Sequence, residues 1–275
     1  MAAIRNGSRY FEGTLMILSK WKIKRRIGSL SNVLPIVVYK TVDSTNTQAK
    51  LAAESGKYKN AVFIASEQTA GRGRLGRSFT SNKGKGIYLS ILLNEKMPAA
   101  KATALTTYMA VIASEAIDNL SGIETKIKWV NDIYLNGKKL SGILTEGKGS
   151  DNGESIDYAV IGIGINLLKQ DFPEDVSNIA TTLEDVIGKK INANDLAARI
   201  IKDFFNELSL AGEREIADRY RKKSFLIGER VTVIKPTEEY EATVNGITDK
   251  CELLLTLDNG QAETLSTGEV SVRKI

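Results

Sequence analysis

The stretch from Thr69 to Ser78, TAGRGRLGRS, most constrains the fold, because it matches two phosphate-binding motifs that each belong to a particular architecture. Its glycines fit the dinucleotide pattern G-x-G-x-x-G, and Gly71 to Ser78 also fits a P-loop in which arginine replaces the lysine. Both motifs work only when the loop opens a helix whose free N–H groups face the phosphates. Here a polar segment and the apolar run Ile87 to Leu93 follow, which predicts a strand. The dinucleotide-binding fold and the P-loop fold are therefore both excluded.

The residue composition limits the chemistry that an active site can use. The 275-residue chain contains one cysteine, Cys251, and no histidine. This excludes disulfides, zinc sites that need histidine, and the Cys-His and Ser-His pairs of nucleophilic enzymes. Catalysis must therefore rely on arginine, lysine, carboxylates, amides and the backbone. The formal net charge of +5 is mild, and it suits an anionic small ligand as well as nucleic acid.

The sequence also indicates where the protein works. No apolar run approaches the length of a membrane span, and the segment 1–11 is polar, with Arg5 and Arg9 where a secretory signal would be apolar. An apolar content of 42% is ample for a core. We therefore expect a globular, cytoplasmic protein with no membrane association.

The body of the chain mixes short apolar strands with amphipathic helices. Strands are predicted at 35–42, 61–65, 87–93, 126–135, 138–144 and 159–167, and helices at 47–54, 102–120 and 193–210. Asn136 and Gly137 lie between two apolar runs and both tolerate positive φ, so a β-hairpin is predicted there. The hairpin places Lys139 on a rigid strand.

The two ends of the chain differ from this body. The segment 20–26, KWKIKRR, is predicted to be a solvated basic arm or edge segment, with a nucleic-acid contact as the alternative. From Phe225 onward, short strands separated by turns, near 230–234, 240–247, 251–257 and 270–272, predict a small β-barrel. The expected division is a basic extension at 1–35, a catalytic domain at 36–222 and a barrel at 223–275.

Polar residues gather in three clusters on the predicted α/β layer, and these are Ser44-Thr45-Asn46, Gln68 with Arg72 and Arg74, and Lys139. Together they predict a pocket that hydrogen-bonds a neutral polar group at one end and holds anions at the other. Taken singly, Ser44 and Thr45 also fit helix caps, and Lys139 fits an exposed hairpin lysine. Gly162 and Gly164 either let a ligand or another backbone come close or serve packing alone.

Four motifs, DSTN, EQTAGRGRLGR, KWVNDIYLNGKKLSGIL and GIGIN, in this order and spacing, resemble those of the biotin protein ligases, the biotin–acetyl-CoA-carboxylase ligases. The resemblance extends from about Val37 to the C-terminus. It implies an α+β fold of the class II synthetase type, with a mixed β-sheet flanked by helices and a small C-terminal SH3-like β-barrel. Members that repress transcription carry an N-terminal winged helix. The short segment before residue 36 has no two-helix pattern, so we expect a ligase without repressor function.

The resemblance implies a reaction in two steps. The biotin carboxylate first joins the α-phosphorus of ATP, which carries Mg²⁺ on its triphosphate, to give biotinyl-5′-AMP and pyrophosphate. A lysine of a biotin carboxyl carrier protein, part of a biotin-dependent carboxylase, then attacks the mixed anhydride. Because the partner supplies the nucleophile, the site can work without histidine. The resemblance is compatible with a homodimer, DNA binding is not expected, and no protein ligands for Mg²⁺ are assigned.

The resemblance also implies which residues bind each substrate. The catalytic cations are Arg72, Arg74 and Lys139. The biotin site consists of Ser44, Thr45, Asn46, Gln68, Gly71, Arg72, Gly73, Arg74, Lys139 and Gly142. The ATP and adenylate site consists of Arg74, Arg77, Phe79, Asn131, Asp132 and Asn166. Short polar side chains suit the ureido ring of biotin, since each of its polar groups left unpaired in a buried pocket would cost about 1–3 kcal/mol.

Two other functions are weighed against this one. A lipoate protein ligase has a related fold and similar adenylate chemistry, but the dithiolane of lipoate offers Ser44, Thr45 and Gln68 nothing to hydrogen-bond. A nucleic-acid-binding protein would use the basic arm and the barrel, but the barrel segment is rich in glutamate and offers only Tyr240 for base stacking. One departure from the family is Val130, which stands where most members have proline and loosens the backbone near the adenine side.

Overall fold

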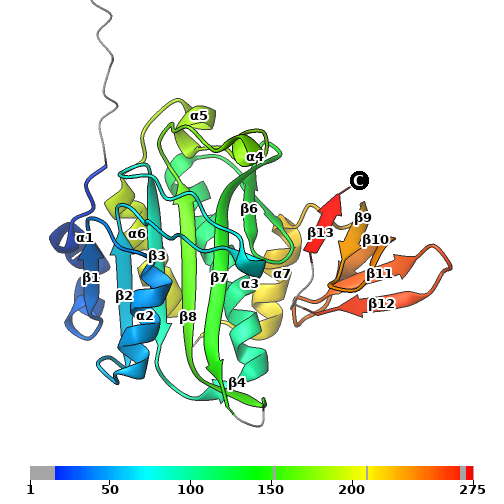
Figure 1. The fold of residues 1–275 in the computed structure, drawn as a ribbon, viewed down its shortest axis with the longest axis horizontal. Helices are drawn as coiled ribbons and strands as arrows, with labels where there is room; N and C mark the ends of the chain where they lie inside the picture. The colour runs from blue at the N-terminus through cyan, green and yellow to red at the C-terminus, as the bar shows by residue number, and fades with distance from the viewer. Residues whose placement is uncertain (1–15, 151–152, 209, 267–270, 275) are drawn as a thin grey trace, which may run out of the picture.

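The computed structural model of the protein describes residues 16–150, 153–208, 210–266 and 271–274. Its centre is an eight-stranded sheet with the path β1-β2-β3-β8-β7-β6-β5, in which β4 also pairs with β8 (Figure 1). The strands are β1 (Ile36–Tyr39), β2 (Asn60–Ala65), β3 (Gly86–Leu93), β4 (Met97–Pro98), β5 (Lys126–Lys128), β6 (Asp132–Leu135), β7 (Lys138–Gly149) and β8 (Ser155–Asn166). β1 and β2 are parallel and the other neighbours are antiparallel. The predicted mixed sheet is confirmed.

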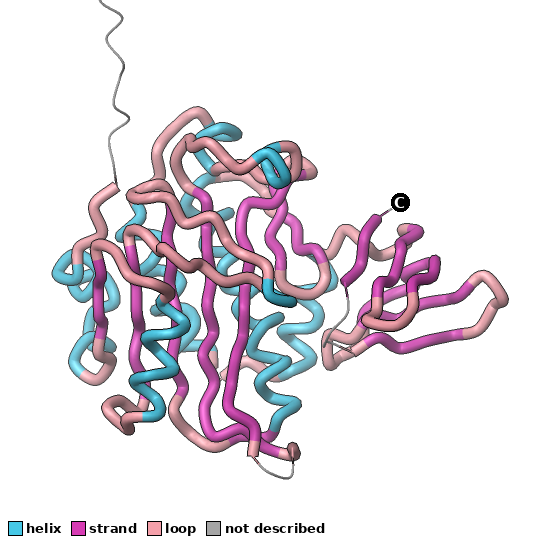
Figure 2. Tube along the Cα trace, viewed as in Figure 1, coloured by secondary structure: helices cyan, strands magenta, loops and turns pink. Residues whose placement is uncertain are grey.

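The two faces of this sheet have different surroundings. Along β8, Ile161, Ile163 and Ile165 belong to the main hydrophobic core, whereas Gly162 and Gly164 line a pocket on the opposite face. On the core face lie α3 (Ala99–Ser121) and α6 (Ala193–Glu207), with α1 (Lys20–Ile27) packed on α6 and α7 (Glu213–Lys223) packed on α3 (Figure 2). On the other face, α2 (Thr45–Glu54) covers a smaller apolar cluster. Part of that face is left for the pocket.

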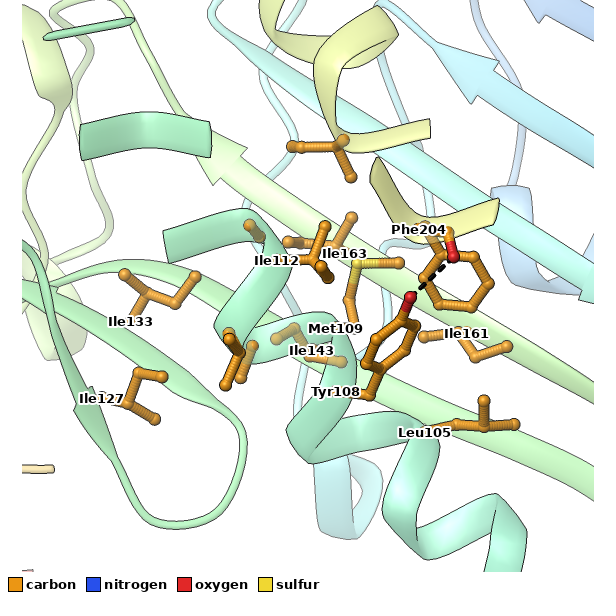
Figure 3. Packing of buried hydrophobic residues seen from close by; sticks show 14 of the residues in the cluster. Leu105, Tyr108, Met109, Ile112, Ile127, Ile133, Ile143, Ile161, Ile163 and Phe204 are labelled. Carbon is orange, nitrogen blue, oxygen red and sulfur yellow. Dashed lines mark hydrogen bonds between the residues drawn. The ribbon is translucent and has the colours of Figure 1, made fainter. Parts of the chain in front are cut away.

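A hydrogen bond joins α3 and α6 in addition to their apolar packing. The Tyr108 hydroxyl donates to the carbonyl oxygen of Phe204 at 2.7 Å, and the centroids of the two rings lie 5.1 Å apart (Figure 3). Met109 and Ile112 follow on the same buried face of α3. The amphipathic helix predicted at 102–120 is confirmed, and the one predicted at 193–210 is confirmed as far as Glu207, where α6 ends.

The basic segment near the N-terminus was predicted to be a solvated arm or an edge segment. It is a helix packed on α6, so the solvated arm is wrong. Ile23 and Ile27, four residues apart, are buried on one face of α1, while the lysines and arginines face solvent or rim the contact. Arg26 pairs with Asp195 of α6, and the backbone N–H of Ser19 donates to Asn194 Oδ1 at 2.7 Å. The basic residues of this segment obscured the helical spacing of Ile23 and Ile27 in the sequence. The predictions for residues 1–15 fall outside the described chain.

The predicted hairpin forms, but the run before it is not one strand. Asn136 and Gly137 have φ angles of 49° and 75°, as the two-residue turn between β6 and β7 requires. The run 126–135 breaks into β5 and β6, which pair antiparallel around a turn that includes the cis peptide bond Trp129–Val130. This turn brings Asn131 and Asp132 to the pocket.

The C-terminal segment forms a separate antiparallel sheet with the order β12-β11-β10-β9-β13 (Figure 1). Its strands are β9 (Arg230–Ile234), β10 (Glu239–Ile247), β11 (Leu253–Leu257), β12 (Ala262–Leu265) and β13 (Ser271–Lys274). The predicted small β-module is confirmed, although Val270, where its last strand was expected to begin, lies outside the described residues. The remaining helices are η1 (Gly28–Asn32), η2 (Arg74–Gly76), α4 (Glu174–Ser177) and α5 (Leu183–Ile187). Within the described residues, no helix is long and apolar enough to cross a membrane.

Candidate active site

A pocket of about 870 Å³ opens on the face of the sheet that carries α2. With the exception of Gly71, every predicted site residue lines it, and these are Ser44, Thr45, Asn46, Gln68, Arg72, Gly73, Arg74, Arg77, Phe79, Asn131, Asp132, Lys139, Gly142 and Asn166. Gly71 belongs to the arginine loop, the stretch from Thr69 to Ser78, but it packs against the protein, since an added Cβ would lie 2.3 Å from the carbonyl oxygen of Phe79. Residues from distant parts of the sequence thus meet in one cavity.

The glycines of β8 form the floor of this pocket. A Cβ at Gly162 would lie 2.1 Å from Asn46 Oδ1, and a Cβ at Gly164 would lie 2.4 Å from the Phe79 ring. The two glycines therefore make room for side chains of the protein, which agrees with the packing alternative predicted for them and not with the close approach of a ligand or another backbone. Gly142 on β7 continues this floor, since its Cβ would lie 3.4 Å from the same ring.

A relay of short polar side chains forms one end of the pocket. Gln68 Oε1 lies 2.8 Å from the Thr45 backbone nitrogen, which donates to it, and 3.0 Å from Thr45 Oγ1. The buried Ser90 hydroxyl lies 2.7 Å from Thr45 Oγ1 and 2.6 Å from Asn46 Oδ1. Ser44 is the N-cap residue of α2, but its side chain makes no capping hydrogen bond. Ser90 was not predicted as a site residue, and its signal in the sequence is a lone hydroxyl inside the apolar run of β3.

Glu146 of β7 ends this relay and was also missed. Its Oε2 accepts a hydrogen bond of 2.9 Å from Asn46 Nδ2, and its Oε1 lies 2.9 Å from Lys50 Nζ and 3.2 Å from Arg72 Nη2. Burial raises the pKa of this carboxyl, but the hydrogen bonds from Asn46 and Lys50 and the charges of Lys50 and Arg72 outweigh burial and bring the pKa below its usual value. Glu146 is therefore an anion that connects the relay to Arg72.

The arginine loop folds back on itself as a small irregular hairpin. Arg72 and Ser78 form an antiparallel bridge, and the Gly73 N–H donates to the Arg77 carbonyl at 2.7 Å. Leu75 lies at its tip with φ 55°, in the left-handed region. The loop leads into β3, as expected, and offers no N-terminus of a long helix to a phosphate. Its anion-binding groups are therefore side chains.

The opposite end of the pocket holds two pairs of polar groups. Arg74 Nη1 donates to Asn131 Oδ1 at 3.1 Å, and Asn131 Nδ2 donates to the Ile143 carbonyl at 2.9 Å. Lys139 Nζ lies 2.7 Å from Asp132 Oδ1. Burial lowers the pKa of the Arg74 guanidinium, and the charge of Asp132 offsets part of that shift. An anion that enters between these cations would compensate for their desolvation.

A β-bulge directs Lys139 into the pocket. Along β7, Ser141 pairs with Ile133 and Lys139 pairs with Tyr134, so Leu140 is an extra residue. In a regular strand, Lys139 and Gly142 would face opposite sides of the sheet. The bulge brings them to one side, because a Cβ at Gly142 would lie 3.2 Å from the Lys139 side chain.

Comparison with known proteins identifies the family. The biotin/lipoate A/B protein ligase family matches residues 38–166, and the biotin protein ligase C-terminal domain matches residues 226–273. The biotin–[acetyl-CoA-carboxylase] ligase of Mycobacterium tuberculosis is 31% identical over 254 residues, which cover 89% of this chain and 91% of that protein. This chain belongs to the biotin protein ligase family.

Two further members resemble this biotin protein ligase over most of its length. The bifunctional ligase/repressor BirA of Bacillus subtilis is 32% identical over 230 residues, 82% of this chain and 70% of that protein. The biotin protein ligase from Aquifex aeolicus, in complex with biotin and ATP, matches with a TM-score of 0.75 and 29% identity over 88% of this chain and 99% of that chain. The α+β fold with an SH3-like C-terminal domain is thereby confirmed.

In this biotin protein ligase, the C-terminal domain is attached at the turn that carries Asn131. Trp129 Nε1 donates to the carbonyl oxygen of Cys251 at 2.9 Å. On the catalytic side of the same turn, the buried hydroxyl of Tyr220 of α7 donates to the Val130 carbonyl at 3.1 Å. Val272 of β13 lines the pocket itself. The C-terminal domain therefore contributes to the site in two ways, through a wall residue and through the turn that it holds.

Proposed function

We propose that this biotin protein ligase joins biotin to ATP, as the magnesium complex, and then transfers the biotinyl group to a lysine of a biotin carboxyl carrier protein. The observation that carries the proposal is a single pocket with a polar hydrogen-bonding relay at one end and Arg74 and Lys139 at the other. Biotin has the matching shape, a ureido ring joined by an apolar chain to a carboxylate. ATP supplies the second anion at the cationic end.

Recognition of the ureido ring falls to the relay. Ser44, Thr45 and Gln68 present hydroxyl and amide groups to the pocket, and this pattern matches a ring with two N–H donors and one carbonyl. Asn46 lies deeper, against Gly162, and holds Ser90. Gly73 and Gly142 let the ligand approach the backbone beside this end.

Formation of the adenylate requires two anions to approach each other. Arg72, Arg74 and Lys139 offset the repulsion between the biotin carboxylate and the triphosphate, and the stabilisation is greatest where charge converges in the transition state. One carboxylate oxygen bonds to the α-phosphorus, and the bond to the bridging oxygen of pyrophosphate breaks with its electron pair. Pyrophosphate leaves and biotinyl-5′-AMP stays bound.

The nucleotide occupies the side formed by the loop and the β5–β6 turn. Asn131, Asp132 and Asn166 offer amide and carboxylate groups to the adenosine, and Arg77 faces its phosphates. Phe79 covers the pocket floor at the centre, between the two substrates. Among the described residues, no group of three or more histidine, cysteine, aspartate or glutamate side chains could hold a metal ion. In this proposal, Mg²⁺ enters on the triphosphate of the nucleotide.

The transfer step needs no nucleophile from the enzyme. The acceptor lysine loses a proton, its nitrogen attacks the carbonyl carbon of the mixed anhydride, and AMP leaves with the electron pair of the broken C–O bond. An amide between biotin and the acceptor results. The pocket must therefore hold the adenylate until the carrier protein docks.

Several finer assignments extend this proposal. We place the enzyme in the cytoplasm, a reducing compartment that suits a chain whose single cysteine, Cys251, is free and buried. A homodimer is compatible with the proposal, and DNA binding is not part of it. Lipoate is disfavoured as the substrate, since its dithiolane would leave Gln68 and Thr45 without partners.

Exchange of labelled pyrophosphate into ATP tests the proposal without an acceptor protein. Exchange should depend on biotin and should not occur with lipoate. A second assay with ATP, biotin and a carrier domain should label one lysine. Exchange that proceeds equally with lipoate, or that is absent with biotin, would refute the proposed substrate.

A further inference from the structure

We propose that Glu146 is a positioning residue that anchors the arginine loop through Arg72 and thereby limits how fast bound biotinyl-5′-AMP dissociates. The contact is an ion pair, in which Arg72 Nη2 lies 3.2 Å from Glu146 Oε1. Arg72 lines the pocket, whereas Glu146 is not among the lining residues. The effect on the adenylate rests on the proposed function, but the anchoring of the loop does not.

The carboxylate of Glu146 is the fixed end of this ion pair. Two donors of α2 hold it, since Asn46 Nδ2 lies 2.9 Å from Oε2 and Lys50 Nζ lies 2.9 Å from Oε1. The side chain of Glu146 is 17% exposed, compared with 48% for Arg72. Because α2 and the sheet hold the carboxylate without help from the loop, Arg72 is the member that can move.

The tip of the arginine loop, residues 72–77, bonds largely to itself. The Gly73 N–H donates to the Arg77 carbonyl at 2.7 Å, and the Arg77 N–H donates to the Arg74 carbonyl at 3.2 Å. Side chains join this tip to the sheet, through Arg72 to Glu146 and through Arg74 to the turn between β5 and β6. A hairpin with its own hydrogen bonds can move as a unit, so these side-chain contacts decide where it lies.

The two side-chain contacts differ in their relation to the substrates. Arg74 lies at the end of the pocket where the two anions react, so bound anions compete with Asn131 for its guanidinium. The ion pair of Arg72 and Glu146 lies at the biotin end, beside Asn46, and the proposed reaction changes neither group. This ion pair can therefore hold the loop during both steps.

The anchor leaves this end of the pocket positively charged. Lys50 and Arg72 both pair with the one carboxylate of Glu146, so two cations and one anion give the three side chains a net charge of +1. Glu146 therefore fixes the position of Arg72 without removing the positive charge that attracts an anionic ligand.

A double-mutant cycle tests the anchor. Glu146→Gln removes the charge with little change in shape, and Asn46 stays held because its Nδ2 also lies 3.3 Å from the Leu144 carbonyl. This exchange should raise the dissociation rate of preformed biotinyl-5′-AMP about threefold to fivefold, the range that a partly exposed ion pair supports. Arg72→Gln breaks the same contact, so Glu146→Gln should have almost no further effect in that background.

The mobility of the loop is measured without any ligand. The only cysteine, Cys251, is buried, so Leu75→Cys at the 51% exposed tip of the loop gives a single accessible site for a nitroxide spin label. Electron paramagnetic resonance then reports the ratio of mobile to immobile label. Glu146→Gln should raise this ratio about threefold to fivefold, and Arg72→Gln should remove any further effect of that exchange.

Two controls separate a freed loop from a weakened fold. Lys50→Met removes the other cation on Glu146 and keeps Arg72, so the label and the adenylate should behave as in the wild type. A label at Val33→Cys, which is 78% exposed and outside the loop, should keep its mobility in Glu146→Gln. Arg72→Gln breaks the ion pair from its more exposed side, so the mobility result does not depend on the melting temperature of Glu146→Gln.

The outcomes distinguish the anchor from the proposed function. Unchanged mobility of the loop label in Glu146→Gln would overturn the anchor. Faster dissociation of the adenylate in Glu146→Gln that persists in full in the Arg72→Gln background would also overturn it, because the effect would not pass through Arg72. A wild type that binds no biotin would instead overturn the assignment of the substrate and leave the result of the loop label standing.

Discussion

Trp129 donates its indole N–H to the carbonyl oxygen of Cys251 across 2.9 Å, in a buried contact between the catalytic sheet and the C-terminal domain. Trp129→Phe removes the donor and leaves that carbonyl buried without its partner, at a cost of about 1–3 kcal/mol in the free energy of unfolding. We expect adenylate formation to fall more than biotin binding, since the Trp129 turn carries Asn131. Trp21→Phe, at an exposed indole, is the control. A larger loss of biotin affinity than of ATP use would contradict this division.

Lys139 should act mainly in the first step. Lys139→Ala removes a cation that the β7 bulge directs at the pocket and leaves Asp132 without that partner. Pyrophosphate exchange should slow by the equivalent of roughly 2–4 kcal/mol in the activation free energy. Lys138→Ala, at the exposed neighbour in the same hairpin, should have no such effect. If only transfer to the acceptor falls, Lys139 has another role.

Arg74 should retain the adenylate as well as help to make it. Arg74→Gly removes the partly buried cation that Asn131 orients, so biotinyl-5′-AMP should dissociate faster and label lysines of an unrelated protein. Leu75→Gly is a matched control, because it adds the same backbone freedom one residue away without loss of charge. Equal bystander labelling by both variants would show that loop flexibility, and not the guanidinium, controls release.

The floor of the pocket should tolerate no side chain at Gly164. Gly164→Ala places a Cβ 2.4 Å from the Phe79 ring, which has to move, so biotin affinity should fall and unfolding should become easier by about 1–3 kcal/mol. Gly149→Ala, on β7 where a Cβ meets nothing within 4 Å, is the control. Calorimetry and urea denaturation on both variants measure the difference. Unchanged biotin affinity in Gly164→Ala would mean that Phe79 does not border the ligand.

Glu146 should make stability depend on pH in the acid range. Its pKa is below the usual value of 4.5, because hydrogen bonds from Asn46 and Lys50 outweigh the effect of burial, which raises it. A depressed folded-state pKa contributes stability that is fully present above the unfolded-state pKa and is lost as the pH falls through the folded-state pKa. Urea unfolding at several pH values should show the advantage of wild type over Glu146→Gln shrinking toward low pH. A constant difference would exclude this contribution.

Local patterns predicted the parts of the fold that depend on neighbouring residues. The Asn136-Gly137 turn and the helix over 102–120 follow from turn chemistry and from apolar spacing, and both appear in the structure. The helix α1 was missed because five basic residues conceal the pair Ile23 and Ile27. Its packing surface on α6 is a tertiary contact that no local rule reveals.

Sequence motifs predicted most residues that line the pocket. They did not predict the long-range contacts and the bulge that complete the site. Glu146 is 100 residues from Asn46 in the sequence, so nothing local links the two. Strict alternation along β7 would also turn Lys139 away from Gly142, and only the extra residue Leu140 reverses this. Bulges and long-range partners depend on the whole sheet, and the sequence alone does not encode them in a readable pattern.

The strand β7 has one more consequence. It lies between β6 and β8 and contains Lys139, Gly142 and Leu144, whose carbonyl accepts a hydrogen bond from Asn46. The end of the pocket that holds the polar side chains and the end that holds Lys139 are therefore joined by one covalent backbone. A strand advances about 3.3 Å per residue and cannot stretch. The distance between the two ends of the pocket is therefore fixed, and the length of the substrate has to match it. Acids with one methylene more or fewer than biotin should place the carboxylate out of reach of Lys139, and no exchange of side chains at either end would restore the fit.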